Sequence, residues 1–304
     1  MLIPERTLSE EGIELQFATN HIGHFLFTNL IMPKLIKAAE GSPKGATRIV
    51  NVSSGSPMGA TMRWSDMWVT PGVPYFPYWS FWRDTRHGTR IKESFIVWPV
   101  ALFVIYIGGR TWTRRRSSSR CSDYAYANFR FRSNFEKVNK DLPQDEQPNY
   151  AFHSAWGVTD TENKSYIPLE GYNQSKVANV LFGVGANKRL YEKYGILSLG
   201  LHPGVIKTEL GRSAVPETLT AIDAMAKSGV FTYKTLGAGA ATSLVAALDP
   251  KLGVGGTKNG KENYGAFLAD CQISDQARAE STSSAEAEKL WKLSEKLVND
   301  TFAW

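Results

Sequence analysis

Two side chains able to exchange protons, Tyr172 and Lys176, stand four residues apart in a stretch with helical periodicity. Side chains at positions i and i+4 lie on one face of a helix, so the phenol and the ammonium are expected to be neighbours. A nearby cation favours the phenolate and lowers the tyrosine pKa toward the range useful for acid–base work. The spacing therefore predicts a general acid–base pair, although a solvated pair on a helix surface has the same pattern.

Polar residues follow two apolar runs that are expected to be strands. Ser53 and Ser54 come directly after residues 48–52, and a Pro-Gly turn that begins at Pro203 comes directly after residues 196–201. Open parallel sheets bind their ligands at the carboxyl ends of the strands. Each feature is common alone. Their order along the chain, a strand with a serine pair, a tyrosine–lysine helix and a strand with a turn, is much more specific than any one of them.

The elements that must position these residues alternate along the chain. Apolar spacing predicts helices over residues 12–39 (with Pro33 kinking or interrupting the helix), 172–194 and 235–248, and one that starts near the capping-box sequence at 283–286. Buried strands are expected at 48–54, 196–201 and 263–268, and a loop at 141–170. Such alternation predicts an α/β fold with a parallel sheet covered by helices.

Several motifs together resemble the short-chain dehydrogenase/reductase family. They are Gln16-Phe-Ala-Thr-Asn-His-Ile-Gly-His-Phe25, Arg48-Ile-Val-Asn-Val-Ser-Ser54, Tyr172-Asn-Gln-Ser-Lys176, His202-Pro-Gly204 and Gly265-Ala-Phe-Leu-Ala-Asp-Cys271. The chain is most similar to the retinol-dehydrogenase-like and WW-domain-oxidoreductase-like branch, in its fungal form. This resemblance covers about two thirds of the chain and implies a Rossmann-like fold.

The resemblance also implies residue roles in hydride transfer between NADP, or NAD, and a carbonyl or alcohol. Tyr172 would be the general acid in reduction and the base in oxidation, and Ser54 would hydrogen-bond the substrate oxygen. Lys176 would hold the nicotinamide ribose, and Asn20 would hold a water that relays protons to it. Cofactor-binding residues would be Tyr172 and Lys176, followed by the loop residues Pro203, Gly204, Ile206 and Thr208.

The substrate class and the partners are less closely defined. Residues 209–230 would form a lid of moderately apolar character, which suits a small lipophilic carbonyl or alcohol. A homo-oligomer is left open, and no nucleic-acid partner is expected. His21 and His24 lack a third ligand, so we expect no metal site.

Two departures from the family pattern stand out, and the first concerns the N-terminal region. The family begins with a strand and the turn Thr-Gly-x-x-x-Gly-x-Gly, which seats the pyrophosphate; neither is present in these 304 residues. We therefore expect a Rossmann-like domain that is truncated at its N-terminus, with unpaired strand edges and weakened dinucleotide binding. The alternative function is an inactive remnant, or the product of an incorrectly assembled gene, that lacks the dinucleotide-binding half.

The second departure is an atypical insertion at 66–133, which divides the domain into 1–65 and 134–304. Residues 59–133 hold eleven Arg and one Lys against four acidic residues, a balance of +8, whereas the whole chain carries +6. Translated non-coding sequence explains this composition best. A membrane anchor at 95–107 is one alternative, but its 13 apolar residues are too few to span a bilayer easily. Nucleic-acid binding is another alternative, but no recognisable nucleic-acid-binding module accompanies the arginines.

The remaining composition fits a globular protein in a reducing compartment. The chain holds 26 Gly, 14 Pro and only two Cys, Cys121 and Cys271, which excludes collagen-like and disulfide-framed classes. The first residues, which begin Met1-Leu-Ile-Pro, have neither the basic nor the apolar region of a secretory signal. A cytoplasmic protein is expected, with membrane association as the alternative.

Overall fold

The computed structural model describes residues 2–71, 104–106, 129–133, 135–214 and 216–304. The helices are α1 (Leu15–Phe17), α2 (Gly23–Ala39), α3 (Tyr150–Ala155), α4 (Pro168–Tyr194), α5 (Pro216–Lys227), α6 (Leu236–Leu248), α7 (Ala279–Thr282) and α8 (Ser284–Val298). The strands are β1 (Arg48–Val52), β2 (Met67–Pro71), β3 (Val104–Tyr106), β4 (Phe129–Ser133), β5 (Leu197–His202), β6 (Phe267–Ala269) and β7 (Gln272–Ile273).

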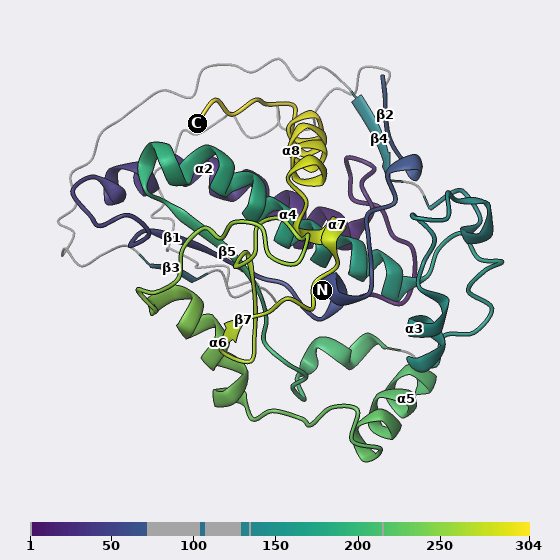
Figure 1. The fold of residues 1–304 in the computed structure, drawn as a ribbon. Helices are drawn as coiled ribbons and strands as arrows, with labels where there is room; N and C mark the ends of the chain where they lie inside the picture. Colours follow the sequence, from purple (N-terminus) through teal and green to yellow (C-terminus); the bar gives the residue numbers. More distant parts are fainter. Residues whose placement is uncertain (1, 72–103, 107–128, 134, 215) are drawn as a thin grey trace, which may run out of the picture.

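A five-stranded sheet in the order β3-β1-β5-β6-β7 forms the centre of the molecule (Figure 1). Its inner pairs, β1 with β5 and β5 with β6, are parallel, and the outer strands β3 and β7 run antiparallel to their neighbours. The predicted α/β class with helix-covered parallel strands is thereby confirmed.

Alternate residues of the central strands face two different helical layers. Ile49 packs with residues of α2, α4 and α8, whereas its neighbour Val50 packs with α6. Successive side chains of a strand point to opposite faces, so α2, α4 and α8 cover one face and α6 covers the other. Both residues are fully buried, which explains why β1 reads as a continuous apolar run.

The helix at residues 12–39 is interrupted, but not at Pro33. A five-residue π-helix, Ala18–Ile22, joins α1 to α2, and α2 then continues through Pro33 to Ala39. Pro33 therefore does not interrupt the helix as expected, and the expected kink there stays a prediction. The wider π-turn falls instead on the stretch that carries Asn20, and π-turns inside helices are frequent at functional sites.

Other boundaries differ modestly from the prediction. The expected loop at 141–170 contains α3, which is capped by the Asn149 side chain accepting from the amide of Phe152 at 2.9 Å. The expected strand at 263–268 is shifted to β6, with β7 paired beside it. In the described residues no helix combines the length and the apolar character needed to cross a bilayer.

The segment expected to be an insertion begins and ends in one small sheet. β2 and β4 pair antiparallel, with Pro71 opposite Phe129, so the two ends of the segment lie together. Residues 72–103 and 107–128 lie outside the described part, and with them Arg114–Arg116 and most of the proposed anchor at 95–107. The domain boundaries at 65 and 133 stay a prediction.

One expectation about the strand edges is wrong. The outer edge of β1 is not left unpaired, because β3 lies antiparallel to it, with Ile49 opposite Ile105. An open edge exposes unpaired backbone groups, and β3 pairs with residues 48–50 of β1. The strand that does so comes from within residues 66–133.

Candidate active site

The predicted tyrosine, lysine and serine converge where β1 ends. Ser54 lies two residues beyond β1, and Tyr172 and Lys176 lie in the first turns of α4, which packs across that strand. Ser54 lies close enough to the Tyr172 hydroxyl to lower its pKa, and the Lys176 Nζ lies 5.7 Å from the centre of the Tyr172 ring. The arrangement joins two segments 118 residues apart in the sequence.

Lys176 is fixed by the strand itself. Its Nζ donates to the carbonyl oxygen of Val52, the last residue of β1, at 3.0 Å. The preceding serine is structural: the Ser53 hydroxyl donates to the Lys176 carbonyl at 2.7 Å and thus ties the helix to the strand. Of the serine pair, only Ser54 faces Tyr172.

Burial sets the protonation of both proton-exchanging groups. It raises the pKa of Tyr172 to about 12, with the neighbouring Ser54 acting in the opposite direction, and lowers the pKa of Lys176 to about 8. The sequence-based expectation was a lowered tyrosine pKa. The pKa is raised because the free-energy cost of removing the phenolate from water outweighs the stabilisation that Ser54 gives the phenolate. At neutral pH the site therefore presents a protonated phenol beside an ammonium.

Asn20 lies one side chain away from the tyrosine. Its Nδ2 donates to the Ser175 hydroxyl at 3.0 Å, and this hydroxyl donates to the Tyr172 carbonyl at 2.7 Å. The π-helix brings the Asn20 amide, 2% exposed, against α4. The neighbouring His21, for which the sequence predicted no metal-binding role, hydrogen-bonds Ser294 through Nε2 at 2.8 Å.

The loop after β5 lies at the same edge of the sheet but makes its contacts with α6 and Lys234. Pro203 opens the loop, and Gly204 has φ +87°, with Lys234 lying where a side chain would project. Ile206 pairs with Lys234 in a short parallel bridge and packs against Gly239. Thr208 caps the next helical turn by accepting from the amide of Leu210 at 3.3 Å. Their contact with a cofactor stays a prediction.

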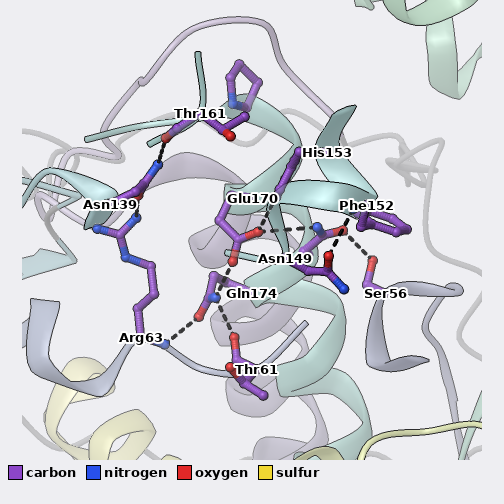
Figure 2. Close-up of polar contacts among 12 residues, drawn as sticks. Ser56, Thr61, Arg63, Asn139, Asn149, Phe152, His153, Thr161, Glu170 and Gln174 are labelled. Atoms are coloured by element: carbon purple, nitrogen blue, oxygen red, sulfur yellow. Dashed lines mark hydrogen bonds and ion pairs between the residues drawn. The ribbon is translucent and has the colours of Figure 1, made fainter. Parts of the chain in front are cut away.

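A buried polar cluster behind Tyr172 was missed by the sequence analysis (Figure 2). Its centre is Glu170, 2% exposed, whose Oε2 lies 2.9 Å from His153 Nε2 and whose Oε1 accepts from Gln174 at 2.8 Å. Arg63 lies at the far side and forms a buried ion pair with Asp66 at 2.6 Å. Burial alone would raise the pKa of Glu170, but the hydrogen bond and charge of His153, the Gln174 amide and the Arg63 charge hold it below its usual value.

The cluster is continuous with the site through two further side chains. Asn173 Nδ2 donates to Glu170 Oε2 at 3.4 Å, and its Oδ1 accepts from the Ser56 hydroxyl at 2.8 Å. Ser54 donates to Ser56 at 2.7 Å and accepts from the Ser56 amide at 3.0 Å. The available signal was the spacing of Glu170, Asn173 and Gln174, which places three polar groups on one helical face.

Comparison with known proteins gives relatives but no matching family model. An uncharacterised oxidoreductase of Schizosaccharomyces pombe is 28% identical over 251 residues, 82% of this chain and 46% of that protein. The chloroplastic short-chain dehydrogenase TIC 32 A of Brassica napus is 27% identical over 293 residues, 96% of this chain and 59% of its own length. The chain thus spans about half the length of these relatives.

Shorter matches carry similar names. A short-chain dehydrogenase/reductase of Armillaria gallica is 41% identical over 68 residues, 22% of this chain and 21% of that protein. A solved structure of an uncharacterised Mycobacterium paratuberculosis protein covers 99% of this chain and 65% of its own, with 17% identity and a TM-score of 0.39. Several relatives are therefore named oxidoreductases or short-chain dehydrogenases, and none of these names specifies the retinol-dehydrogenase-like branch.

Proposed function

We propose that the chain is an oxidoreductase of the short-chain dehydrogenase type that reduces a carbonyl, or oxidises an alcohol, on a small lipophilic substrate. The observation that carries this proposal is the convergence of the Tyr172 phenol, the Ser54 hydroxyl and the Lys176 ammonium at the end of β1. The names of the relatives support the same reaction class.

Tyr172 is the proton donor in the direction of reduction. Its pKa of about 12 keeps the phenol protonated at neutral pH, the form that a general acid requires. After proton transfer, the ammonium of Lys176 stabilises the phenolate that remains. Ser54, next to the Tyr172 hydroxyl, is placed to donate a hydrogen bond to the same substrate oxygen as negative charge develops on it.

The residues present suit the nicotinamide end of NADP, or of NAD. A buried ammonium next to the tyrosine matches the hydroxyls of a ribose, and the loop that begins at Pro203 follows β5 at the same edge of the sheet. Lys176 would hold the ribose, and the loop residues Pro203, Gly204, Ile206 and Thr208 would line the nicotinamide. The cofactor would supply the hydride.

Reductase activity is tested by following NADPH and NADH consumption with a panel of aliphatic and aromatic aldehydes and ketones. We expect turnover with lipophilic carbonyls, and we expect Tyr172→Phe to lower kcat by about 10²- to 10⁴-fold, the usual contribution of a general acid. Tyr264→Phe is the matched control, because this phenol accepts from Lys258 at an exposed site away from the lid and the loop after β5. A Tyr172→Phe variant as active as the wild type would refute the role of Tyr172, and a chain inactive on the whole panel would favour the inactive remnant.

A further inference from the structure

Lys234 lies across the loop that follows β5. Its amide donates to the Val205 carbonyl at 2.9 Å, beside the short parallel bridge that Lys234 forms with Ile206. Its side chain runs over Gly204, because a Cβ on that glycine would lie 2.6 Å from both Cδ and Cε of Lys234. The backbone and side chain of Lys234 together therefore contact three successive residues of the loop.

The ammonium of Lys234 reaches a different element, the turn between β6 and β7. It forms an ion pair with the Asp270 carboxylate, and this bond lowers the pKa of Asp270 below its usual value, so the carboxylate is ionised at neutral pH. Strand β6 lies next to β5 in the sheet and runs parallel to it. Lys234 thus joins the loops that follow two neighbouring parallel strands.

The turn that carries Asp270 is held in place without help from Lys234. Asp270 and Cys271 are its two residues, and both have a left-handed backbone, with φ +49° and +64°. The Cys271 amide donates to the Thr242 hydroxyl of α6 at 3.1 Å, and Thr242 is fully buried; α6 and β7 lie side by side (Figure 1). A left-handed backbone at two successive non-glycine residues persists where the surroundings determine it, so the turn gives the Asp270 carboxylate a defined position.

The other side of the loop faces a less firmly held element, the expected lid. Lys207 Nζ lies 4.6 Å from the centre of the Tyr233 ring, and the Tyr233 hydroxyl donates to Asp223 of α5 at 3.0 Å. Only Thr218 is buried among the twelve residues of α5. Few buried contacts mean low local stability, so the firm attachment of the loop is on the side of α6 and the β6–β7 turn.

We propose that Lys234 is a positioning residue, whose ion pair with Asp270 holds the loop after β5 in the conformation that receives the nicotinamide. The inference rests on the proposed function, which assigns this loop to the cofactor. A cofactor that meets a loop already in place does not have to order the loop on binding, so the ion pair raises cofactor affinity. Its contribution is modest and sensitive to salt, because the Lys234 and Asp270 side chains are 24% and 71% exposed.

Two substitutions remove the ion pair and keep the shapes of its residues. Lys234→Met retains an unbranched apolar stem over Gly204, and Asp270→Asn retains a residue that tolerates the left-handed backbone. Lys234→Arg keeps the charge. Lys44→Met is the matched control, because Lys44 also pairs with a carboxylate, that of Glu192 at 2.7 Å, but precedes β1 at the opposite edge of the sheet.

The primary readout follows the loop itself and needs neither cofactor nor turnover. In protein labelled with carbon-13 at isoleucine Cδ1, the signal of Ile206, which packs against Gly239, is assigned by its loss in Ile206→Val. We expect this signal to shift in Lys234→Met and in Asp270→Asn, and to move in the same direction in the wild type at high salt. It should keep its position in Lys44→Met and stay near it in Lys234→Arg. A signal that is unchanged in both Lys234→Met and Asp270→Asn overturns the inference.

Cofactor affinity, measured by titration of NADPH fluorescence, is the second readout. We expect Lys234→Met and Asp270→Asn each to raise the Kd for NADPH about two- to fivefold at low salt, the scale of one exposed ion pair. The double variant should bind no more weakly than either single variant, because both remove the same interaction. A direct contact of Lys234 with a cofactor phosphate predicts instead that Asp270→Asn frees the ammonium and lowers the Kd, and that result overturns the inference.

The two readouts separate this inference from the proposed function. If the Ile206 signal shifts as expected but the wild type binds neither NADPH nor NADH, the proposed function fails, while the role of the ion pair in placing the loop is upheld. If the wild type binds NADPH and reduces carbonyls, and the Kd is the same in Lys234→Met, Asp270→Asn and Lys44→Met, the inference is overturned and the proposed function stands.

Discussion

At the scale of single residues, the burial of Lys176 costs folding stability, although the proposed chemistry needs its ammonium. Lys176 is 4% exposed, and burial lowers its pKa from 10.5 to about 8. A buried ammonium that donates to a backbone carbonyl and not to a carboxylate destabilises the folded chain, because the charge loses its hydration. Such a residue is typical of sites where function and stability conflict.

Lys176→Met should therefore stabilise the protein while it abolishes activity. The pKa shift corresponds to about 3 kcal/mol of disfavoured charge at pH 7, from which about 1 kcal/mol is subtracted for the lost bond to Val52. We expect a gain in the free energy of unfolding of about 1–3 kcal/mol, measured by urea denaturation. A variant clearly less stable than the wild type would contradict this account.

The pH dependence of that gain has a definite sign. Between pH 8 and pH 10.5 the unfolded chain keeps the Lys176 proton and the folded chain releases it, so the stability of the wild type rises with pH. The advantage of Lys176→Met should accordingly shrink as the pH is raised from 7 to 10. A gain that stays constant over this range would show that packing, and not charge, explains it.

At the scale of elements, sequence periodicity predicted most helices and the central strands. It failed where tertiary contacts determine the local backbone or bring distant residues together. The helix at 172–194 was expected and begins four residues earlier, because Pro168 suits a first helical turn. The π-helix at Ala18–Ile22 and the passage of α2 through Pro33 have no local signature. The polar cluster was missed because Arg63, His153 and Glu170 are far apart in the sequence and meet only on folding.

The contact of α6 with the loop after β5 depends on one glycine. A Cβ on Gly239 would lie 2.1 Å from Ile206 Cδ1, whereas a Cβ on Gly237 in the same helix would meet nothing within 4 Å. Because Ile206 belongs to the proposed nicotinamide loop, Gly239 keeps that loop in place. The two positions form a matched pair for testing the loop.

Gly239→Ala should displace the loop, and Gly237→Ala should not. In Gly237→Ala we expect a gain of about 0.5–1 kcal/mol in the free energy of unfolding, since alanine is the better helix former. In Gly239→Ala the clash should outweigh this gain, and the KM for the cofactor should rise severalfold. Equal cofactor KM values in the two variants would show that the position of this loop does not affect cofactor binding.

At the scale of the whole molecule, the charge and composition break at residues 66–133 was visible in the sequence, but its structural consequence was not. The break favoured non-coding sequence, whereas unpaired strand edges were expected from the missing N-terminal strands. In the structure, three of its residues form β3 and pair with β1, and its ends pair as β2 and β4. Pairing partners far apart in the chain are not encoded in local composition, so sequence patterns could not reveal them.

The pairing of β3 with β1 predicts that this segment protects the central sheet. Ile105→Pro removes a backbone donor and restricts the backbone of β3, opposite Ile49 of β1, without shortening the chain. We expect the exposed edge of β1 to cause concentration-dependent association, seen by light scattering, while the helical circular dichroism signal changes little. Replacing residues 72–128 by a short turn between Pro71 and Phe129, which already lie opposite each other, should give the same association because it removes β3 altogether. If both variants stay monodisperse at the concentrations at which the wild type does, β3 is dispensable to the sheet, and residues 72–128 are not needed to protect it.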